Sequence, residues 1–250
     1  ASSHEFLFCL TIHHIACDGW SISIIMKEIA NLYDHYSNIT SRMITSPQLR
    51  YCDFAVWERE RWQNGGLNTQ LDYWRKKLNN GNVPTLHLVT SPVHTQTNGQ
   101  SFNAHSVDFV IDSDVANNLR AVALRLNMTM FMIINAAAQL TLSRFSGQND
   151  FAIGVPVAGR SQSEFDSTIG CFVNTLPILS DVKGGRQTAT EFLTAVRSTC
   201  IEAFANSDVP FDRLVNELKV SRVDAVGAPL CQASVSYTEK DVDSDAANIF

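Results

Sequence analysis

The N-terminal segment has the pattern of a buried strand, a polar turn and a helix, and this pattern constrains the fold more than any other part of the chain. Residues 6–12 form a nearly continuous apolar run, which is typical of a central strand that is buried on both faces. From residue 21 to residue 36 the apolar side chains recur at helical spacing. The turn between them, residues 13–19, reads His-His-Ile-Ala-Cys-Asp-Gly.

The turn carries side chains that suit proton transfer. Histidine is the side chain whose ordinary pKa lies close to neutral pH, so His13 or His14 could act as a general base. A structural or surface pair is the alternative. Adjacent strand residues point to opposite faces, so we do not expect one metal ion to bind both histidines. Asp18 is expected to orient the turn or cap the next helix, and Gly19 to allow backbone angles that other residues resist.

The rest of the chain alternates between helical and strand-like patterns, which predicts an α/β protein. Strands are expected over residues 104–111, 151–157, 172–179 and 230–237. Further helices are expected near residues 54–61, 71–78, 115–126, 130–145, 188–205 and 211–218, with Asp112 near the start of the third and residues 64–66 ending the first. Residues 90–101 hold Ser, Thr, Pro, Asn, Gly and Gln and are predicted to be an exposed linker.

Composition excludes several classes of protein. The 250 residues are 45% hydrophobic and carry a net charge of −6, which argues against binding to nucleic acid. The six cysteines form no CxxC pair, so we expect buried free thiols in a reducing cytoplasm and no zinc site. The longest apolar run, residues 128–142, is interrupted by polar residues and is too short to span a membrane.

Several segments resemble the ordered motifs of one enzyme family. Residues 13–19 match the HHxxxDG motif of condensation domains from nonribosomal peptide synthetases. Residues 51–57 resemble the family's YxDFAxW, and residues 169–176 its IGxFVNT. Residues 207–212 are similar to QDxPFE, with Ser and Asp where the family has Gln and Glu. Residues 221–232 match RDxSRNPLFQ more weakly.

The resemblance implies a chloramphenicol-acetyltransferase-like fold, in which two α/β lobes with mixed sheets face each other across a tunnel. The family's two N-terminal motifs precede the histidine motif, so the resemblance implies an internal fragment with most of the first lobe missing. Residues 1–89 would be the C-terminal part of the first lobe, with the HHxxxDG motif. Residues 90–101 would be the inter-lobe linker, and residues 102–250 a second lobe truncated at its C-terminus.

The resemblance also implies a reaction and its partners. In the family, an amine on one carrier-bound aminoacyl thioester attacks the carbonyl of a carrier-bound acyl or peptidyl thioester, and a peptide bond forms. The domain itself would bind no cofactor, since both substrates arrive on phosphopantetheine arms of upstream and downstream peptidyl carrier domains, with an adenylation domain nearby. No nucleic acid, metal or membrane is implied. The alternatives are a stand-alone acyltransferase of the same superfamily and a non-catalytic partner-binding platform.

The family's residue roles can be carried over to matching positions. His14, the second histidine, would take the proton from the attacking amine or orient that amine. His13, Asp18 and Gly19 would support the motif, and Asp18 would pair with an arginine, either Arg160 or one outside this chain.

Three further residues are candidates for the substrate tunnel. Trp20 and Ser21 follow the motif directly, and Asn174 would either hydrogen-bond a substrate or lock neighbouring strands. The DGWS ending resembles domains that join two L-residues rather than epimerising or D-accepting relatives, which usually read DGVSWR.

Overall fold

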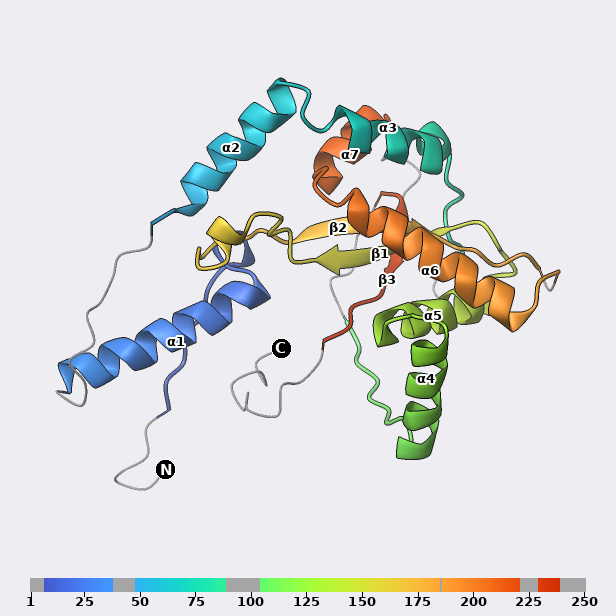
Figure 1. Ribbon diagram of the computed structural model, residues 1–250, viewed down its shortest axis with the longest axis horizontal. Coiled ribbons are helices and arrows are strands. Elements are labelled where there is room, and N and C mark those ends of the chain that lie inside the picture. Colours follow the sequence, from blue (N-terminus) through green and yellow to red (C-terminus); the bar gives the residue numbers. More distant parts are fainter. Residues whose placement is uncertain (1–6, 38–47, 89–103, 185, 221–228, 239–250) are drawn as a thin grey trace. The chain divides into compact units, whose positions relative to one another are not determined.

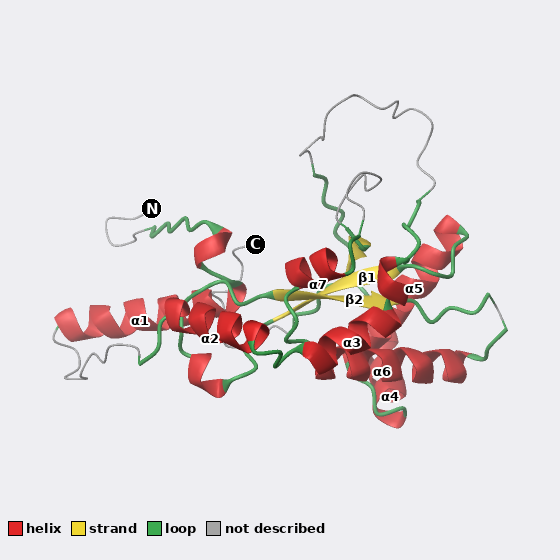
Figure 2. Ribbon diagram, turned by 90° about the horizontal axis from the view of Figure 1, so that it is seen from above, coloured by secondary structure: helices red, strands yellow, loops and turns green. Residues whose placement is uncertain are grey.

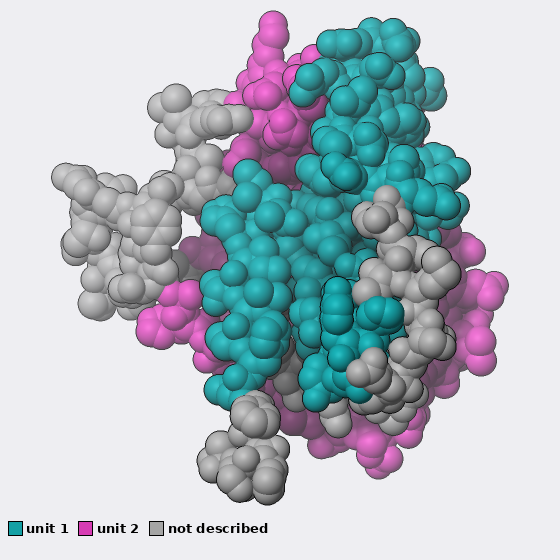
Figure 3. All heavy atoms as spheres, turned by 90° about the vertical axis from the view of Figure 1, so that its left-hand side faces the viewer, with its two compact units in different colours: residues 1–70, 157–174 teal, residues 71–156, 175–250 magenta. Residues whose placement is uncertain are grey.

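The computed structural model describes residues 7–37, 48–88, 104–184, 186–220 and 229–238 (Figure 1). Contacts divide the chain into two compact units, which Figure 3 colours separately. Unit 1 comprises residues 1–70 and 157–174, and unit 2 comprises residues 71–156 and 175–250. This division differs from the lobe boundaries expected at residues 89 and 102, which stay a prediction. The expected linker, residues 90–101, lies outside the described residues.

The described residues of unit 1 form two helices and two single 3₁₀ turns. Helix α1 spans Gly19–Tyr36 and helix α2 spans Tyr51–Gln63, while the 3₁₀ turns cover His14–Ala16 and Ser163–Phe165. The helical spacing after Gly19 therefore predicted α1 correctly. The predicted break at residues 64–66 is also confirmed, because α2 ends where Gly65 adopts a left-handed conformation.

Aromatic side chains form the core of unit 1. Phe54 packs against Phe165 and Phe172, with ring centroids 5.3 and 4.6 Å away. Trp57 packs beside this cluster, and the guanidinium of Arg61 lies 5.2 Å from the centre of its ring. The spacing of Phe54, Trp57 and Arg61 in the sequence predicts that they share one helix face, and these contacts confirm it.

The strand predicted over residues 6–12 is wrong for the part that the structure describes. Residues 7–12 form no regular structure, and their apolar side chains are exposed, with Leu7 94% and Phe8 62% accessible. A strand needs a neighbour to pair its backbone N–H and C=O groups. No described segment pairs with residues 7–12, so an apolar run alone was not sufficient.

Unit 2 contains the sheet, which has three strands in the order β2-β1-β3 among the described residues (Figure 1). Strand β1 covers Ala152–Val157, β2 covers Asn174–Leu179 and β3 covers Cys231–Ser234. Strands β1 and β3 are parallel, with a register shift after the first β1 residue. These strands confirm three of the five predicted, although β3 is shorter than expected. Burial on both faces of β1 explains its nearly continuous apolar sequence.

Five helices accompany the sheet in the described residues, and Figure 2 shows them with the strands from above. They are α3 (Asn68–Lys77), α4 (Ser113–Arg125), α5 (Met130–Ser146), α6 (Ala189–Ala205) and α7 (Phe211–Glu217).

Side chains tie these helices together. The indole N–H of Trp74 on α3 donates to the carbonyl of Asn206, 2.7 Å away. Phe131 of α5 meets Phe204 of α6 with ring centroids 5.8 Å apart. Thr188 and Glu191 form a capping box at the start of α6. The predicted helices are thus confirmed in type and approximate extent.

Two features of unit 2 differ from what the sequence predicts: residues 104–111 and the burial of α5. The strand expected over residues 104–111 is absent, and its apolar side chains are exposed, including Phe109 and Val110. As with residues 7–12, no described strand pairs with it. Residues 130–145 are apolar nearly all round, a pattern that predicts a buried helix, yet Leu140 and Phe145 of α5 are exposed.

In the described ranges no single helix is long and apolar enough to cross a membrane. Helices α4 and α5 reach that length and apolarity only when taken together, and they meet at a bend of 107°.

In the loop after β1, the backbone at Gly159 passes very close to the backbone of Phe172. Gly159 has φ +66°, and an added Cβ would overlap the carbonyl oxygen of Phe172. Gly147, at the end of α5, has φ +72° with open space around it. Both substitutions to Ala carry the left-handed backbone cost, but only Gly159→Ala adds a clash with backbone. We expect Gly159→Ala to lower the free energy of unfolding by about 1–3 kcal/mol more than Gly147→Ala.

Urea titration followed by circular dichroism measures both variants. Equal losses in the two variants would show that the loop can move away from Phe172.

Candidate functional site

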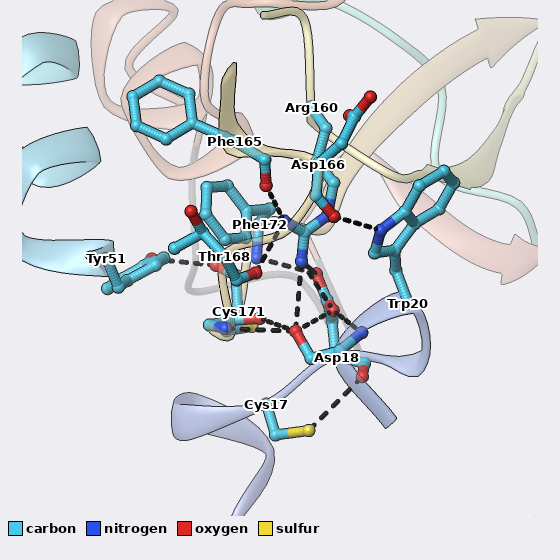
Figure 4. Close-up of polar contacts among 12 residues, drawn as sticks. Cys17, Asp18, Trp20, Tyr51, Arg160, Phe165, Asp166, Thr168, Cys171 and Phe172 are labelled. Atoms are coloured by element: carbon cyan, nitrogen blue, oxygen red, sulfur yellow. Dashed lines mark hydrogen bonds and ion pairs between the residues drawn. The ribbon is translucent and has the colours of Figure 1, made fainter. Parts of the chain in front are cut away.

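The carboxylate of Asp18 is the centre of a buried polar network in unit 1 (Figure 4). Asp18 is 4% exposed and caps α1: its Oδ1 accepts the N–H and the hydroxyl of Ser21, at 2.8 and 2.7 Å. Its Oδ2 accepts the N–H of Phe172 at 3.0 Å. The capping role expected for Asp18 is therefore present, together with a bond to a distant segment.

Arg160 provides the positive charge opposite this carboxylate. Its Nη2 lies 3.2 Å from Asp18 Oδ1, and its Nη1 donates to the carbonyls of Phe165 and Thr168, at 2.6 and 2.8 Å. The side chain is 2% exposed, and its Cζ lies 3.9 Å from the centre of the Phe172 ring. Of the two partners considered for Asp18, the structure shows Arg160.

Ser21 joins the start of α1 to the segment that resembles IGxFVNT. Its Oγ accepts the N–H of Gly170 at 3.0 Å and lies 2.9 Å from the carbonyl oxygen of the same residue. The N–H of Asp18 also donates to that carbonyl, at 3.1 Å. Ser21 is fully buried, so it belongs to this network and not to a substrate-lined surface. The expectation that Ser21 lines a tunnel is corrected on this point.

Tyr51, the first residue of the segment that resembles YxDFAxW, contacts the segment that resembles IGxFVNT. Its hydroxyl donates to the carbonyl of Cys171 at 2.8 Å, and its ring meets that of Phe172 edge-on at 5.1 Å. A Cβ at Gly170 would overlap the Tyr51 ring, which explains a glycine there. Sequence reasoning missed Tyr51, and its position at the start of the YxDFAxW match was the available signal.

Opposing effects act on the pKa of Asp18. Burial alone would raise this pKa, because a charged carboxylate loses its hydration. The hydrogen bonds from Ser21 and Phe172, together with the charge of Arg160, outweigh burial and hold the pKa below its usual value. The carboxylate is therefore ionised at neutral pH and suited to a structural role.

His14 begins the 3₁₀ turn that precedes Asp18 and His13 stands just before this turn, so the histidines do not end a strand as predicted. His13 caps the turn, since its Nδ1 accepts the N–H of Ile15 at 3.1 Å. His14 is exposed, and its Nδ1 lies 3.7 Å from the Sγ of Cys171. Burial, followed by the charge of Asp18, raises the pKa of the Cys171 thiol, so it favours the protonated form. The imidazole of His13 thus bonds within its own turn, whereas that of His14 contacts the distant Cys171.

The other candidate residues lie around this network. Trp20 is half-exposed, and its indole N–H donates to the carbonyl of Asp166 at 2.9 Å. Gly19 begins α1 without a left-handed backbone, and an added Cβ would meet open space. The sharp turn expected at Gly19 is therefore wrong, although the surface beside it is open. Asn174 is the first residue of β2 and is half-buried.

Metal ligation has no support in the described part of the chain. No group of three or more His, Cys, Asp or Glu side chains there is placed to hold an ion. All six cysteines are free thiols, of which Cys17, Cys200 and Cys231 are buried.

The buried pair predicts a stability change that depends on pH. Because the folded-state pKa of Asp18 is lowered, its contribution is complete above the unfolded pKa and is lost as the pH falls through the folded pKa. Asp18→Asn leaves Arg160 buried without its counter-charge, so above about pH 5 we expect a loss of about 3–5 kcal/mol. Below about pH 4 the difference from the unmodified protein should shrink.

Chemical denaturation across this pH range tests the expectation. Asp72→Asn is the control, because Asp72 pairs with Arg75 at the surface and should cost less than about 1 kcal/mol. A loss from Asp18→Asn that does not change with pH would contradict the charge-pair explanation.

Comparison with known proteins places this geometry in a family. The family model of the condensation domain matches residues 1–249. A linear gramicidin synthase of Brevibacillus parabrevis is 36% identical over 242 residues, which are 97% of this chain and 5% of that protein. Gramicidin S synthase 2 of Aneurinibacillus migulanus is 35% identical over 96% of this chain and 5% of its own length. The chain therefore spans a small part of these relatives.

A solved structure agrees with these sequence matches. The condensation domain of monacolin K polyketide synthase superposes with a TM-score of 0.76 at 25% identity, over 89% of this chain and 51% of that one. The expected α/β fold of the chloramphenicol-acetyltransferase type is thereby confirmed. With a family model that matches nearly every residue, the chain belongs to the condensation domain family.

Proposed function

We propose that this chain carries the amide-forming centre of a condensation domain in a nonribosomal peptide synthetase. The observation that carries the proposal is the complete HHxxxDG turn, anchored through Asp18 and Arg160, within a family match of residues 1–249. The relatives named as gramicidin synthases support a role in peptide synthesis.

The proposed reaction joins two thioester-bound substrates. The amine of a carrier-bound aminoacyl thioester attacks the carbonyl carbon of a carrier-bound acyl or peptidyl thioester. A C–N bond forms, the C–S bond of the donor breaks, and the donor phosphopantetheine leaves as a thiol. The amine must lose a proton during this exchange, so a base is required. Phosphopantetheine belongs to the substrates and their carrier domains, and the proposed partners are those carriers and an adenylation domain.

The contacts of the two histidines favour His14 as the residue that acts on the amine. His13 already uses Nδ1 to cap the 3₁₀ turn. His14 is exposed and has its Nδ1 beside Cys171, which leaves its Nε2 as the ring nitrogen for the attacking amine. In this proposal Nε2 accepts the proton or holds the amine by a hydrogen bond.

The buried network acts in this proposal as the support of the histidine turn. Asp18 is four residues from His14 and is fixed to Arg160 and to the segment around Gly170. Holding the imidazole in one place contributes to rate because the reacting groups need not search for their geometry. Asp18 itself is buried and ionised, so its proposed role is to position the turn and not to transfer protons.

Finer assignments rest on the resemblance. Trp20, which is half-exposed, and Asn174 remain proposed contacts of the substrate path. The DGWS ending supports two L-configured substrates. Six free thiols are consistent with the proposed cytoplasmic location, where disulfides are rare.

Substitution of His14 tests the catalytic assignment. In the full natural protein, with donor and acceptor carriers loaded, His14→Ala should lower the rate of amide formation about 10²-fold or more, as loss of a general base does. Mass spectrometry of the carrier-bound product gives the rate, and circular dichroism should show an unchanged fold.

His13→Asn is the matched control. Asn is a good capping residue, so this variant should keep the turn and most of the activity. Normal turnover in folded His14→Ala would exclude the catalytic role. If the unmodified protein joins a carrier-bound acyl group only to a soluble amine or alcohol, it is a stand-alone acyltransferase. If it forms no product at all but binds carriers, it is a binding platform.

A further inference from the structure

Unit 2 contains a group of buried and half-buried polar side chains that the proposed reaction does not use. They come from α3, α5, α6 and the segment just after β2. Four of their atoms are buried and have no hydrogen-bond partner among the described residues: Tyr73 Oη, Asn135 Oδ1, Gln139 Nε2 and Asp181 Oδ2. Such atoms are costly to leave unpaired, so four in one part of a core require an explanation.

A shared helix face relates Asn135 to Gln139, and hydrogen bonds relate Gln139 to Asp181 and Asp181 to Thr199. Asn135 and Gln139 are four residues apart on α5, so they share a face, and both are fully buried. The Oε1 of Gln139 accepts the N–H of Asp181 at 2.9 Å. The Oδ1 of Asp181 accepts the hydroxyl of Thr199 at 3.3 Å.

Two more contacts complete the cluster. The side-chain amide of Asn135 donates to the Sγ of Cys200 at 3.6 Å. Tyr73 shares a face of α3 with Lys77, whose Nζ lies 3.4 Å from the hydroxyl oxygen of Thr199. Burial, followed by the charges of Glu202, Asp181 and Cys200, raises the pKa of the Tyr73 hydroxyl. It stays protonated at neutral pH and can both donate and accept.

The unpaired atoms define which ligand fits. Asn135 Oδ1 and Asp181 Oδ2 are acceptors, Gln139 Nε2 is a donor, and the Tyr73 hydroxyl can be either. A metal ion would face the N–H of Gln139, and an anion would face two acceptors. Water donates twice and accepts twice, which matches the four atoms. We propose that Tyr73, Asn135, Gln139 and Asp181 form the binding site of an internal water molecule.

A water molecule fits these four atoms whether Asp181 is charged or neutral. Burial raises the pKa of this carboxyl group, against the hydrogen bond from Thr199 and the charge of Lys77. If the group is protonated, it donates to the water, and the Tyr73 hydroxyl then accepts. The water would thus connect α3, α5 and the end of β2 in either state, with four hydrogen bonds.

A crystal structure of the protein, at a resolution that shows ordered water, tests the proposal directly. We expect one density peak within about 3.2 Å of at least three of the four atoms. Direct pairing of these side chains with one another, or an empty site, would overturn the proposal.

Water relaxation dispersion with oxygen-17 provides a test in solution. Asn135→Leu is similar in size and removes an acceptor, so the number of slowly exchanging internal waters should fall by one relative to the unmodified protein. An unchanged number in the folded variant would overturn the assignment.

Tyr73→Phe adds a milder variant that should fold. Loss of the hydroxyl leaves the water with one fewer partner, and we expect Tm to fall by about 2–4 °C. Tyr33→Phe is the control: Tyr33 is 68% exposed, so its Tm should not change. Equal Tm values for Tyr73→Phe and the unmodified protein would contradict a hydroxyl bonded within the core.

Discussion

The buried ion pair between Asp18 and Arg160 is the interaction on which the organisation of unit 1 depends. An isolated charge inside a protein is strongly unfavourable, and two charges are tolerated only with close pairing and further hydrogen bonds. Both conditions hold, since the carboxylate accepts from Ser21 and Phe172 while the guanidinium donates to two carbonyls. These bonds reach both α1 and the segment between β1 and β2. The pair therefore fixes the start of α1 and the loops after β1 relative to one another.

The glycines and aromatic residues around the pair follow from the same requirement. The segment after β1 must approach Phe172 closely, which Gly159 allows, and the segment before β2 must pass the ring of Tyr51, which Gly170 allows. The aromatic cluster of Phe54, Phe165 and Phe172 then keeps water away from the charges. Three motifs that are distant in the sequence are consequently parts of one structural unit, with His14 at its exposed edge.

Patterns of neighbouring residues in the sequence predicted the helices and their caps. Strands and long-range hydrogen bonds depend on distant partners, which these patterns do not specify. The helical spacing of α1 and the capping position of Asp18 were visible because both depend on residues within a few positions of each other. The strand expected at residues 6–12 failed because a strand is completed only by another strand, which an apolar run does not specify. Ser21 was expected at a substrate surface, since nothing in a single sequence shows that a hydroxyl bonds a carboxylate, an arginine and a distant glycine. The family resemblance left open whether Arg160 or an arginine outside this chain pairs with Asp18, and the structure shows Arg160 Nη2 at 3.2 Å from Asp18 Oδ1.

The hydrogen bonds of Arg160 depend on the shape of its side chain as well as on its positive charge. Its two terminal nitrogens point in different directions, one toward the carbonyls of Phe165 and Thr168 and the other toward Asp18. A lysine ammonium is a single point and could neutralise the carboxylate only by abandoning the carbonyls, or the reverse. The flat face of the guanidinium also covers the Phe172 ring, which an ammonium cannot match. This position in the fold therefore requires a planar, branched donor. A lysine here would keep the positive charge but could not hold both the carboxylate and the two carbonyls in place.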